Sequence, residues 1–224
     1  MKVIIFGATG MVGQGVLREC LRDPNVESVL AISRGASGQT VNRKTDPKLR
    51  EVVHTDFLNY DALRGEFAGF DACFFCLGIS SAGMTEERYR VITYDYTLTA
   101  ARTLAAVNPG MTFIYVSGMG TDSSERGRTM WARVKGKTEN DLLRLPFKAA
   151  YMFRPALIVP LHGIKSKTKV YRIFYAVTGP LLPLLYRMAP KYVTTTEQVG
   201  RAMIKVAKEG WPKRILENSD INTV

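Results

Sequence analysis

Histidine and cysteine are scarce in this chain, which holds two of the first and three of the second. His54 and His162 stand alone, and a zinc site would need further ligands, so no metal site is predicted. Cys73 and Cys76 have the spacing of a redox motif, but they lie inside the apolar run 72–77. Positions three apart on a strand point to opposite faces, and reactive pairs usually open a helix, so we interpret both as core residues.

Long apolar runs are also missing. The longest nearly uncharged stretch, 173–186, is broken by Gly179, Pro180 and Pro183, whereas a membrane span needs roughly 20 apolar residues. The first residues form a strand and a glycine turn rather than a secretory leader. We therefore expect a soluble protein with a cytoplasmic location.

Acidic residues are absent from Leu142 to Thr196, although the chain as a whole carries a net charge of +11. Most of that excess comes from nine basic residues in this segment: Arg144, Lys148, Arg154, Lys165, Lys167, Lys169, Arg172, Arg187 and Lys191. Such a field attracts anions, including cofactor phosphates, an acidic substrate or an anionic membrane surface. The alternative is a solvated basic face without a partner. No nucleic-acid partner is predicted, because no recognised binding motif is present.

The most informative feature that is present is the N-terminal glycine motif. Residues 3–6 form a continuous apolar run, as in a strand buried on both faces, and helical periodicity begins after Gly10. In a strand–turn–helix of this kind the first glycine allows the tight turn, the second allows the backbone to approach a diphosphate, and the third allows close packing. The helix N–H groups then point at the phosphates. The sequence predicts a dinucleotide site formed by Gly7, Thr9, Gly10, Met11, Val12 and Gly13.

Strands and helices alternate along most of the chain, which predicts a parallel sheet covered on both faces. The expected strands are 3–6, 26–32, 51–54, 71–76, 111–116, 149–153 and 214–216, and the expected helices are the one after Gly10, 85–107, 129–144 and 195–208. The predicted fold is α/β, a Rossmann-type doubly wound parallel sheet in a single domain, 1–224. Within it, the segment 156–195 is expected to form a small C-terminal extension over a substrate cleft or a partner surface.

The end of the second strand bears on cofactor preference. An acidic residue there would bind the free 2′-hydroxyl of NAD, but the chain has Ser33 and Arg34. Because arginine can fork onto a 2′-phosphate, NADP is favoured over NAD. After the third strand, Asp56 and Phe57 are expected near the adenine, with a helix-capping role as the alternative for Asp56.

Ligands in open sheets bind at the carboxyl ends of the strands. Candidate residues at these ends are Cys76, Leu77 and Gly78 for the cofactor, Ser117 for catalysis, and Pro155 and Leu157 beside the nicotinamide. Trp131 and Lys135 lie four residues apart and therefore share one helix face. Lys135 is expected to donate to the nicotinamide ribose.

With these motifs, the chain resembles the atypical short-chain dehydrogenase/reductase group, and in particular its Tat-interacting-protein-like branch, which is NAD(P)-binding and distantly NmrA-like or epimerase-like. The similarity runs nearly end to end and covers Gly7–Gly13, Cys76–Gly78, Asp95–Tyr96, Val134–Gly136, Phe153–Pro155 and Leu216–Asn218. It implies an NADP-binding Rossmann fold whose C-terminal part forms a substrate cleft or a partner surface.

Catalytic members of that group resemble one another in a Ser, Tyr and Lys constellation. The lysine maps to Lys135, and Ser117 maps less securely to the serine because Gly118 and Met119 follow it. The tyrosine position holds Trp131, whose indole N–H is only a donor. Three explanations remain open: another phenol is recruited (Tyr89, Tyr94, Tyr96 or Tyr115), the chemistry needs no protein proton donor, or the protein binds NADP without turnover.

Two functions follow from this pattern. The first is an NADP-dependent oxidoreductase acting on a small carbonyl or alcohol, and the second is a catalytically silent NADP-binding regulator or assembly factor with a protein partner. The aromatic and leucine-rich segment 170–190 is expected to cover the cleft, with a dimer contact or peripheral contact with an anionic membrane as alternatives.

Overall fold

The computed structural model describes residues 1–35, 46–164 and 191–224. In these residues, a parallel sheet of seven strands lies at the centre of the molecule. The strand order is β3-β2-β1-β4-β5-β6-β9, and every neighbouring pair is parallel. The strands are β1 (Lys2–Phe6), β2 (Ser28–Ser33), β3 (Leu49–Val53), β4 (Ala72–Phe75), β5 (Thr112–Val116), β6 (Ala149–Arg154) and β9 (Ile215–Glu217). The order reverses between β1 and β4, where such sheets bind ligands. The predicted doubly wound α/β fold is confirmed.

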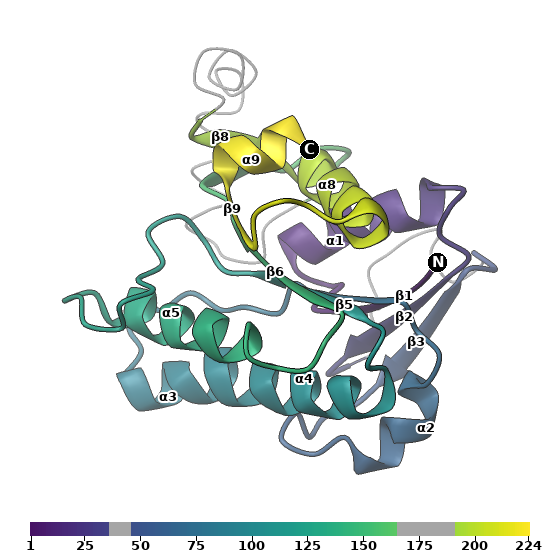
Figure 1. Ribbon diagram of the computed structural model, residues 1–224, viewed down its shortest axis with the longest axis horizontal. Coiled ribbons are helices and arrows are strands. Elements are labelled where there is room, and N and C mark those ends of the chain that lie inside the picture. The colour runs from purple at the N-terminus through teal and green to yellow at the C-terminus, as the bar shows by residue number, and fades with distance from the viewer. Residues whose placement is uncertain (36–45, 165–190) are drawn as a thin grey trace.

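Helices cover both faces of this sheet (Figure 1). One face carries α1 (Met11–Arg22), α8 (Thr196–Glu209) and α9 (Asn218–Thr223). The other carries η1 (Asp61–Leu63), α2 (Arg64–Phe67), α3 (Glu86–Arg90), α4 (Tyr96–Val107) and α5 (Met130–Leu142). Each face therefore has its own apolar core, as expected for strands that are apolar along their whole length.

The helices α1 and α8 approach each other closely through two glycines. A Cβ atom at Gly15 would lie 2.6 Å from the Cβ and backbone oxygen of Thr196, and one at Gly200 would lie 2.8 Å from Cγ of Glu19. Both distances are far below a normal van der Waals contact. Helix α8 is thus packed directly on α1, the helix that follows the glycine motif.

The predicted helix 85–107 is continuous but changes its winding. It runs through α3, a π-helical turn η2 (Val91–Asp95) and α4. Thr85 caps its start by accepting the backbone N–H of Arg88 at 3.4 Å. At the start of α8, Thr195 accepts the N–H of Gln198 at 2.9 Å, but the Gln198 side chain donates to the backbone oxygen of Ile221. Only half of a capping box is therefore formed there.

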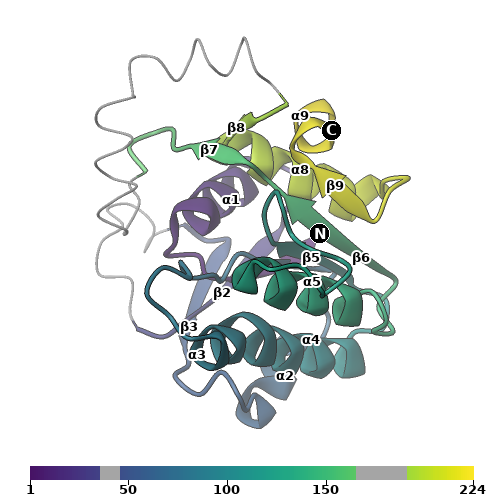
Figure 2. The ribbon, with the colours of Figure 1, turned by 90° about the vertical axis from the view of Figure 1, so that its left-hand side faces the viewer.

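A second, two-stranded parallel sheet lies in the predicted extension 156–195. It consists of β7 (Leu157–Val159) and β8 (Val193–Thr195), seen beside α8 in Figure 2. The apolar segments 170–190 and 173–186 lie outside the described residues. Among the helices that the structure does describe, none combines the length and the hydropathy of a membrane span.

Candidate functional site

The glycine motif forms a tight turn between β1 and α1. Gly7 has φ 78°, and the Gly10 N–H donates to the Gly7 backbone oxygen at 2.9 Å. A Cβ at Gly13 would lie 2.1 Å from that same oxygen, so the position has room only for glycine. Gly10 is the N-cap of α1 and brings no capping side chain, and the first turn holds no acidic residue. The amides at this helix start suit an anion.

The loops after β1 and β4 meet at the reversal of strand order. A Cβ at Gly7 would lie 2.6 Å from the Leu77 nitrogen and 2.8 Å from the Cys76 backbone, while the Cys76 N–H donates to the Phe6 oxygen at 2.9 Å. Two groups of predicted cofactor residues, far apart in sequence, are thereby brought together. Gly78 is exposed, and a Cβ there would meet nothing within 4 Å.

The predicted adenosine end lies where β2 and β3 terminate side by side. Ser33 donates from its hydroxyl to the Gly35 oxygen at 2.8 Å, and Arg34 is exposed. The Asp56 carboxylate accepts the Leu58 N–H at 3.0 Å, which closes a turn and caps no helix. Phe57 is only 2% exposed, because its ring packs in the aromatic core. Its side chain is therefore not available to a nucleotide.

The two predicted catalytic residues are in direct contact, although not through both side chains. The Lys135 ammonium donates to the backbone oxygen of Ser117 at 2.6 Å. The Ser117 hydroxyl, which is buried, donates to Oε1 of Glu139 at 2.5 Å, with the Phe153 oxygen at 3.1 Å as a second acceptor. Because a serine hydroxyl has one proton, that proton is directed into the protein.

Burial lowers the pKa of Lys135 from its usual range to about 8, and the negative charge of Glu139 opposes this shift. The Tyr115 ring lies beneath the ammonium, with 5.7 Å between Nζ and the ring centroid. Such an amine can give up or take a proton near neutral pH more readily than an exposed lysine.

Glu139 and Arg154 form a buried ion pair that sequence analysis missed. Glu139 is fully buried and accepts from Nε and Nη2 of Arg154 at 3.0 and 2.5 Å. Arg154 also reaches Oε1 of Glu217 at 3.2 Å and the Ser123 hydroxyl at 2.6 Å. The sequence did hold one signal: Glu139 lies four residues after Lys135, hence on the same helix face.

The motifs 153–155 and 216–218 are joined by these contacts. Besides the pair formed by Arg154 and Glu217, the Asn218 side-chain oxygen accepts the N–H of Ala156 at 2.9 Å. The Pro155 oxygen accepts the N–H of Met119 at 2.9 Å. Pro155 is thus held at the carboxyl end of β6 beside the loop after β5, while Leu157, half-buried, begins β7.

The four candidate phenols lie in different surroundings. Tyr89 and Tyr115 are each 1% exposed, and burial raises the pKa of both. Tyr94 donates to Asp141 at 2.7 Å, and burial and Asp141 raise its pKa. The half-buried Tyr96 ring packs against Phe57, with 5.6 Å between the ring centroids. Trp131 itself lies over the loop after β5, 3.5 Å from where a Cβ of Gly120 would be.

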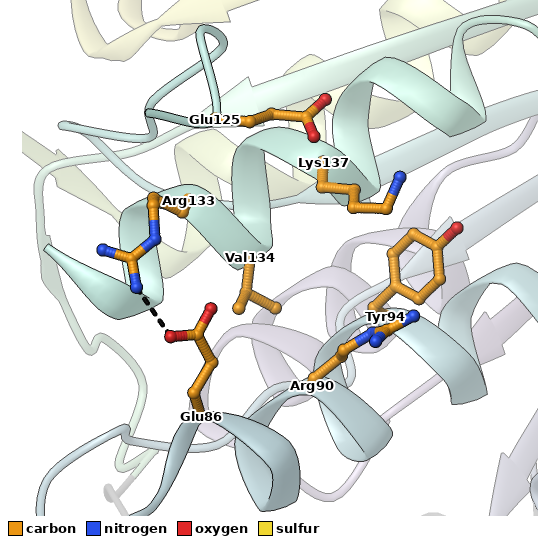
Figure 3. A pocket seen from close by; sticks show the side chains of 7 residues that line it. All are labelled: Glu86, Arg90, Tyr94, Glu125, Arg133, Val134 and Lys137. Atoms are coloured by element: carbon orange, nitrogen blue, oxygen red, sulfur yellow. Dashed lines mark hydrogen bonds and ion pairs between the residues drawn. The ribbon is translucent and has the colours of Figure 1, made fainter. Parts of the chain in front are cut away.

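A separate pocket of about 210 Å³ lies between the helix α3–η2 and α5 (Figure 3). It is lined by Glu86, Arg90, Tyr94, Glu125, Arg133, Val134 and Lys137. Two of its basic residues are paired: Arg133 with Glu86 of the lining at 2.6 Å, and Lys137 with Asp141, outside the lining, at 3.0 Å. None of the predicted cofactor residues lines it, and we assign it no ligand. In the described ranges, no group of histidine, cysteine or acidic side chains could hold a metal ion.

Comparison with known proteins bears on the fold and the family. The curated relatives include the FMP52 proteins of Debaryomyces hansenii, 26% identical over 93% of this chain and 88% of the relative, and Emericella nidulans, 28% identical over 91% and 85%. Among solved structures, Candida albicans Gre2 in complex with NADPH has a TM-score of 0.71 at 12% identity, covering 97% of this chain and 77% of that one. Bordetella bronchiseptica WbmF in complex with NAD+ has a TM-score of 0.68 at 14% identity, covering 99% and 76%. These neighbours show the same fold.

The names of the sequence relatives correct one expectation. The FMP52 proteins of Debaryomyces hansenii, Emericella nidulans and Saccharomyces cerevisiae are named as mitochondrial, which contradicts the expected cytoplasmic location. That expectation rested on the absence of targeting signals, and an absence does not distinguish one compartment from another.

The family model described as NAD(P)H-binding matches residues 7–144. The match begins at the first glycine of the turn and includes Ser117, Lys135 and Glu139. The chain therefore belongs to the NAD(P)H-binding family.

Proposed function

We propose that the protein is an NADP(H)-dependent oxidoreductase of the short-chain dehydrogenase/reductase type that acts on a small carbonyl or alcohol. The observation that carries the proposal is the Lys135 ammonium, held 2.6 Å from the Ser117 backbone oxygen at the carboxyl end of β5. This is the sheet edge at which an open α/β fold binds its ligands. The turn that Gly7 and Gly13 keep clear of side chains fits a nucleotide diphosphate.

NADP is the cofactor we propose, in preference to NAD. Support comes from the end of β2, where Ser33 and the exposed Arg34 stand in place of an acidic residue. An arginine at this point favours a 2′-phosphate, because it forms charge-assisted hydrogen bonds with phosphate oxygens.

The bound nucleotide would supply or accept a hydride, and the chain's own residues would handle the proton. Lys135 has three ammonium protons, one of which is directed to Ser117. The other two would hold the ribose and donate a proton to the oxygen of a carbonyl substrate, and solvent would return that proton to the amine. Burial, which lowers the pKa of Lys135 to about 8, suits this exchange.

A catalytically silent NADP-binding regulator is the second candidate, and Trp131 is the observation that favours it. An indole N–H cannot replace the acid–base role of a phenol. The Tat-interacting-protein-like branch, with a protein partner in place of a substrate, would suit this function. The relatives reported above carry the FMP52 name instead.

Two measurements on purified protein separate these functions. Titration with NADPH and NADH gives the affinities, and loss of nicotinamide absorbance with a panel of aldehydes and ketones gives turnover. We expect Lys135→Met to abolish turnover while NADPH still binds, although more weakly because the ribose loses one donor. Lys137→Met is the matched control, because Lys137 lies on the same helix but pairs with Asp141. Tight NADPH binding with no turnover of any substrate would favour the regulator, and no binding would refute both functions.

A further inference from the structure

Burial of the Glu139 carboxylate is energetically costly, and its contacts extend beyond the ion pair with Arg154. Replacing a buried ion pair by apolar side chains of similar volume is often neutral or stabilising, so stability alone does not account for it. Glu139 also accepts the hydroxyl proton of Ser117, the residue whose carbonyl holds Lys135. One carboxylate is therefore linked to both predicted catalytic residues.

Among the residues that the structure describes, Glu139 is the anionic group that acts on Lys135. On the side of β5, the Lys135 ammonium faces the Tyr115 ring and the Ser117 carbonyl. On its own helix, α5, the neighbouring charge is that of Glu139. Tyr89, next to Tyr115, and Tyr115 itself stay neutral at physiological pH, because burial raises the pKa of both phenols. From β6, Arg154 reaches this region by pairing with Glu139.

We propose that Glu139 is a positioning residue of the nucleotide-dependent site. It fixes Ser117, so that the Ser117 carbonyl holds Lys135 and the Ser117 hydroxyl does not reach the substrate. It also keeps the Lys135 amine protonated. This inference rests on the proposed function for its catalytic meaning, but its physical content is a coupling between two side chains. That coupling exists in the protein with or without turnover.

The test measures the titration of Lys135 without using turnover. The rate at which acetic anhydride labels Lys135 is followed against pH by mass spectrometry in the wild type and in Glu139→Gln. Loss of a buried negative charge near an amine disfavours the ammonium, so we expect the apparent pKa of Lys135 to fall by about one to two units. Glu139→Asp, which keeps the charge, should restore most of the shift.

Glu217→Gln is the matched control, because Glu217 is the other carboxylate on Arg154 but has no contact with Ser117. It should leave the labelling profile of Lys135 unchanged. An unchanged profile in folded Glu139→Gln, or an equal shift in Glu217→Gln, would overturn the proposal. Neither result depends on the proposed enzymatic activity, whose failure shows instead as absent turnover.

Glu139→Gln leaves Arg154 with one carboxylate partner fewer and can fail to fold for that reason. The double variant Glu139→Gln/Arg154→Met removes both charges of the pair and should still show the lowered pKa of Lys135, because the ammonium again loses its anionic neighbour. If this double variant also fails to fold, the carboxylate is needed for folding rather than for Lys135, and the proposal is wrong.

Discussion

Replacement of Ser117 by alanine tests whether its hydroxyl acts on a substrate. In the structure the hydroxyl oxygen of Ser117 lies 2.5 Å from Glu139 Oε1 and 3.1 Å from the Phe153 oxygen, both inside the protein. A hydrogen bond to a charged group is worth about 1.5–3 kcal/mol. We therefore expect Ser117→Ala to lower the free energy of unfolding by about this amount, since Glu139 loses a donor but keeps Arg154.

The effect of the same variant on catalysis should be small. Lys135 is held by the Ser117 backbone oxygen, which alanine retains, so we expect kcat to fall by less than roughly tenfold. A serine that polarised the substrate oxygen would instead cost about 10²–10³ in kcat when removed. The two roles therefore differ by more than the uncertainty of a rate measurement.

The assay combines urea unfolding, NADPH affinity and kcat at saturating NADPH. Ser123→Ala is the control, because Ser123 accepts from Arg154 at 2.6 Å in the same network without being the residue that holds Lys135. A fall in kcat of a hundredfold or more, with the free energy of unfolding and the NADPH affinity unchanged, would refute the reasoning.

Three further predictions follow from the site. Arg34→Ala should weaken NADPH binding by about ten- to a hundredfold and NADH binding little, measured by calorimetry, because only NADPH has the 2′-phosphate; equal losses would contradict the cofactor assignment. Carbonyl reduction should slow as pH rises through about 8, where Lys135 loses its proton, and alcohol oxidation should speed up there; a flat profile of kcat would rule out Lys135 as the proton donor. Gly13→Ala places a Cβ 2.1 Å from the Gly7 oxygen, so it should lower the free energy of unfolding by about 1–3 kcal/mol and weaken the binding of both nucleotides. An unchanged melting temperature and unchanged affinities would show that the turn is not tight.

The central strands could be predicted from sequence because burial on both faces gives a continuous apolar run. Residues 3–6 and 71–76 were assigned to strands within a residue or two, as were most of the others. Val26 was included in β2 although it belongs to the preceding turn, where its N–H donates to Asp23. It is buried like a strand residue, so its pattern alone does not mark the boundary.

The short strands β7 and β8 could not be predicted in the same way. Each has three residues, too few to show a period, and the pairing of Leu157 with Val193 joins distant parts of the chain. The π-helical turn at Val91–Asp95 was missed for a related reason, because it changes the winding of a helix without changing which residues are apolar.

Site prediction succeeded where a single local pattern carries the geometry and fell short where partners come from different elements. The glycine turn is local, and the structure shows the close approaches that its spacing implies. Phe57 was expected at the cofactor, but its side chain belongs to the aromatic core, and this depends on Phe6 and Tyr60. Glu139 was overlooked because its partners, Ser117 and Arg154, lie on other elements of the fold.

The close approach of α1 and α8 ties the end of the chain to its beginning. The family model stops at residue 144, yet α8 lies against α1 with no spare room at Gly15 or Gly200. A larger side chain at Gly200 would have to push α1 aside, and the amides of α1 would move with it. Nucleotide affinity should therefore respond to mutations in a helix nearly two hundred residues downstream of the turn, on a part of the protein that no dinucleotide motif marks.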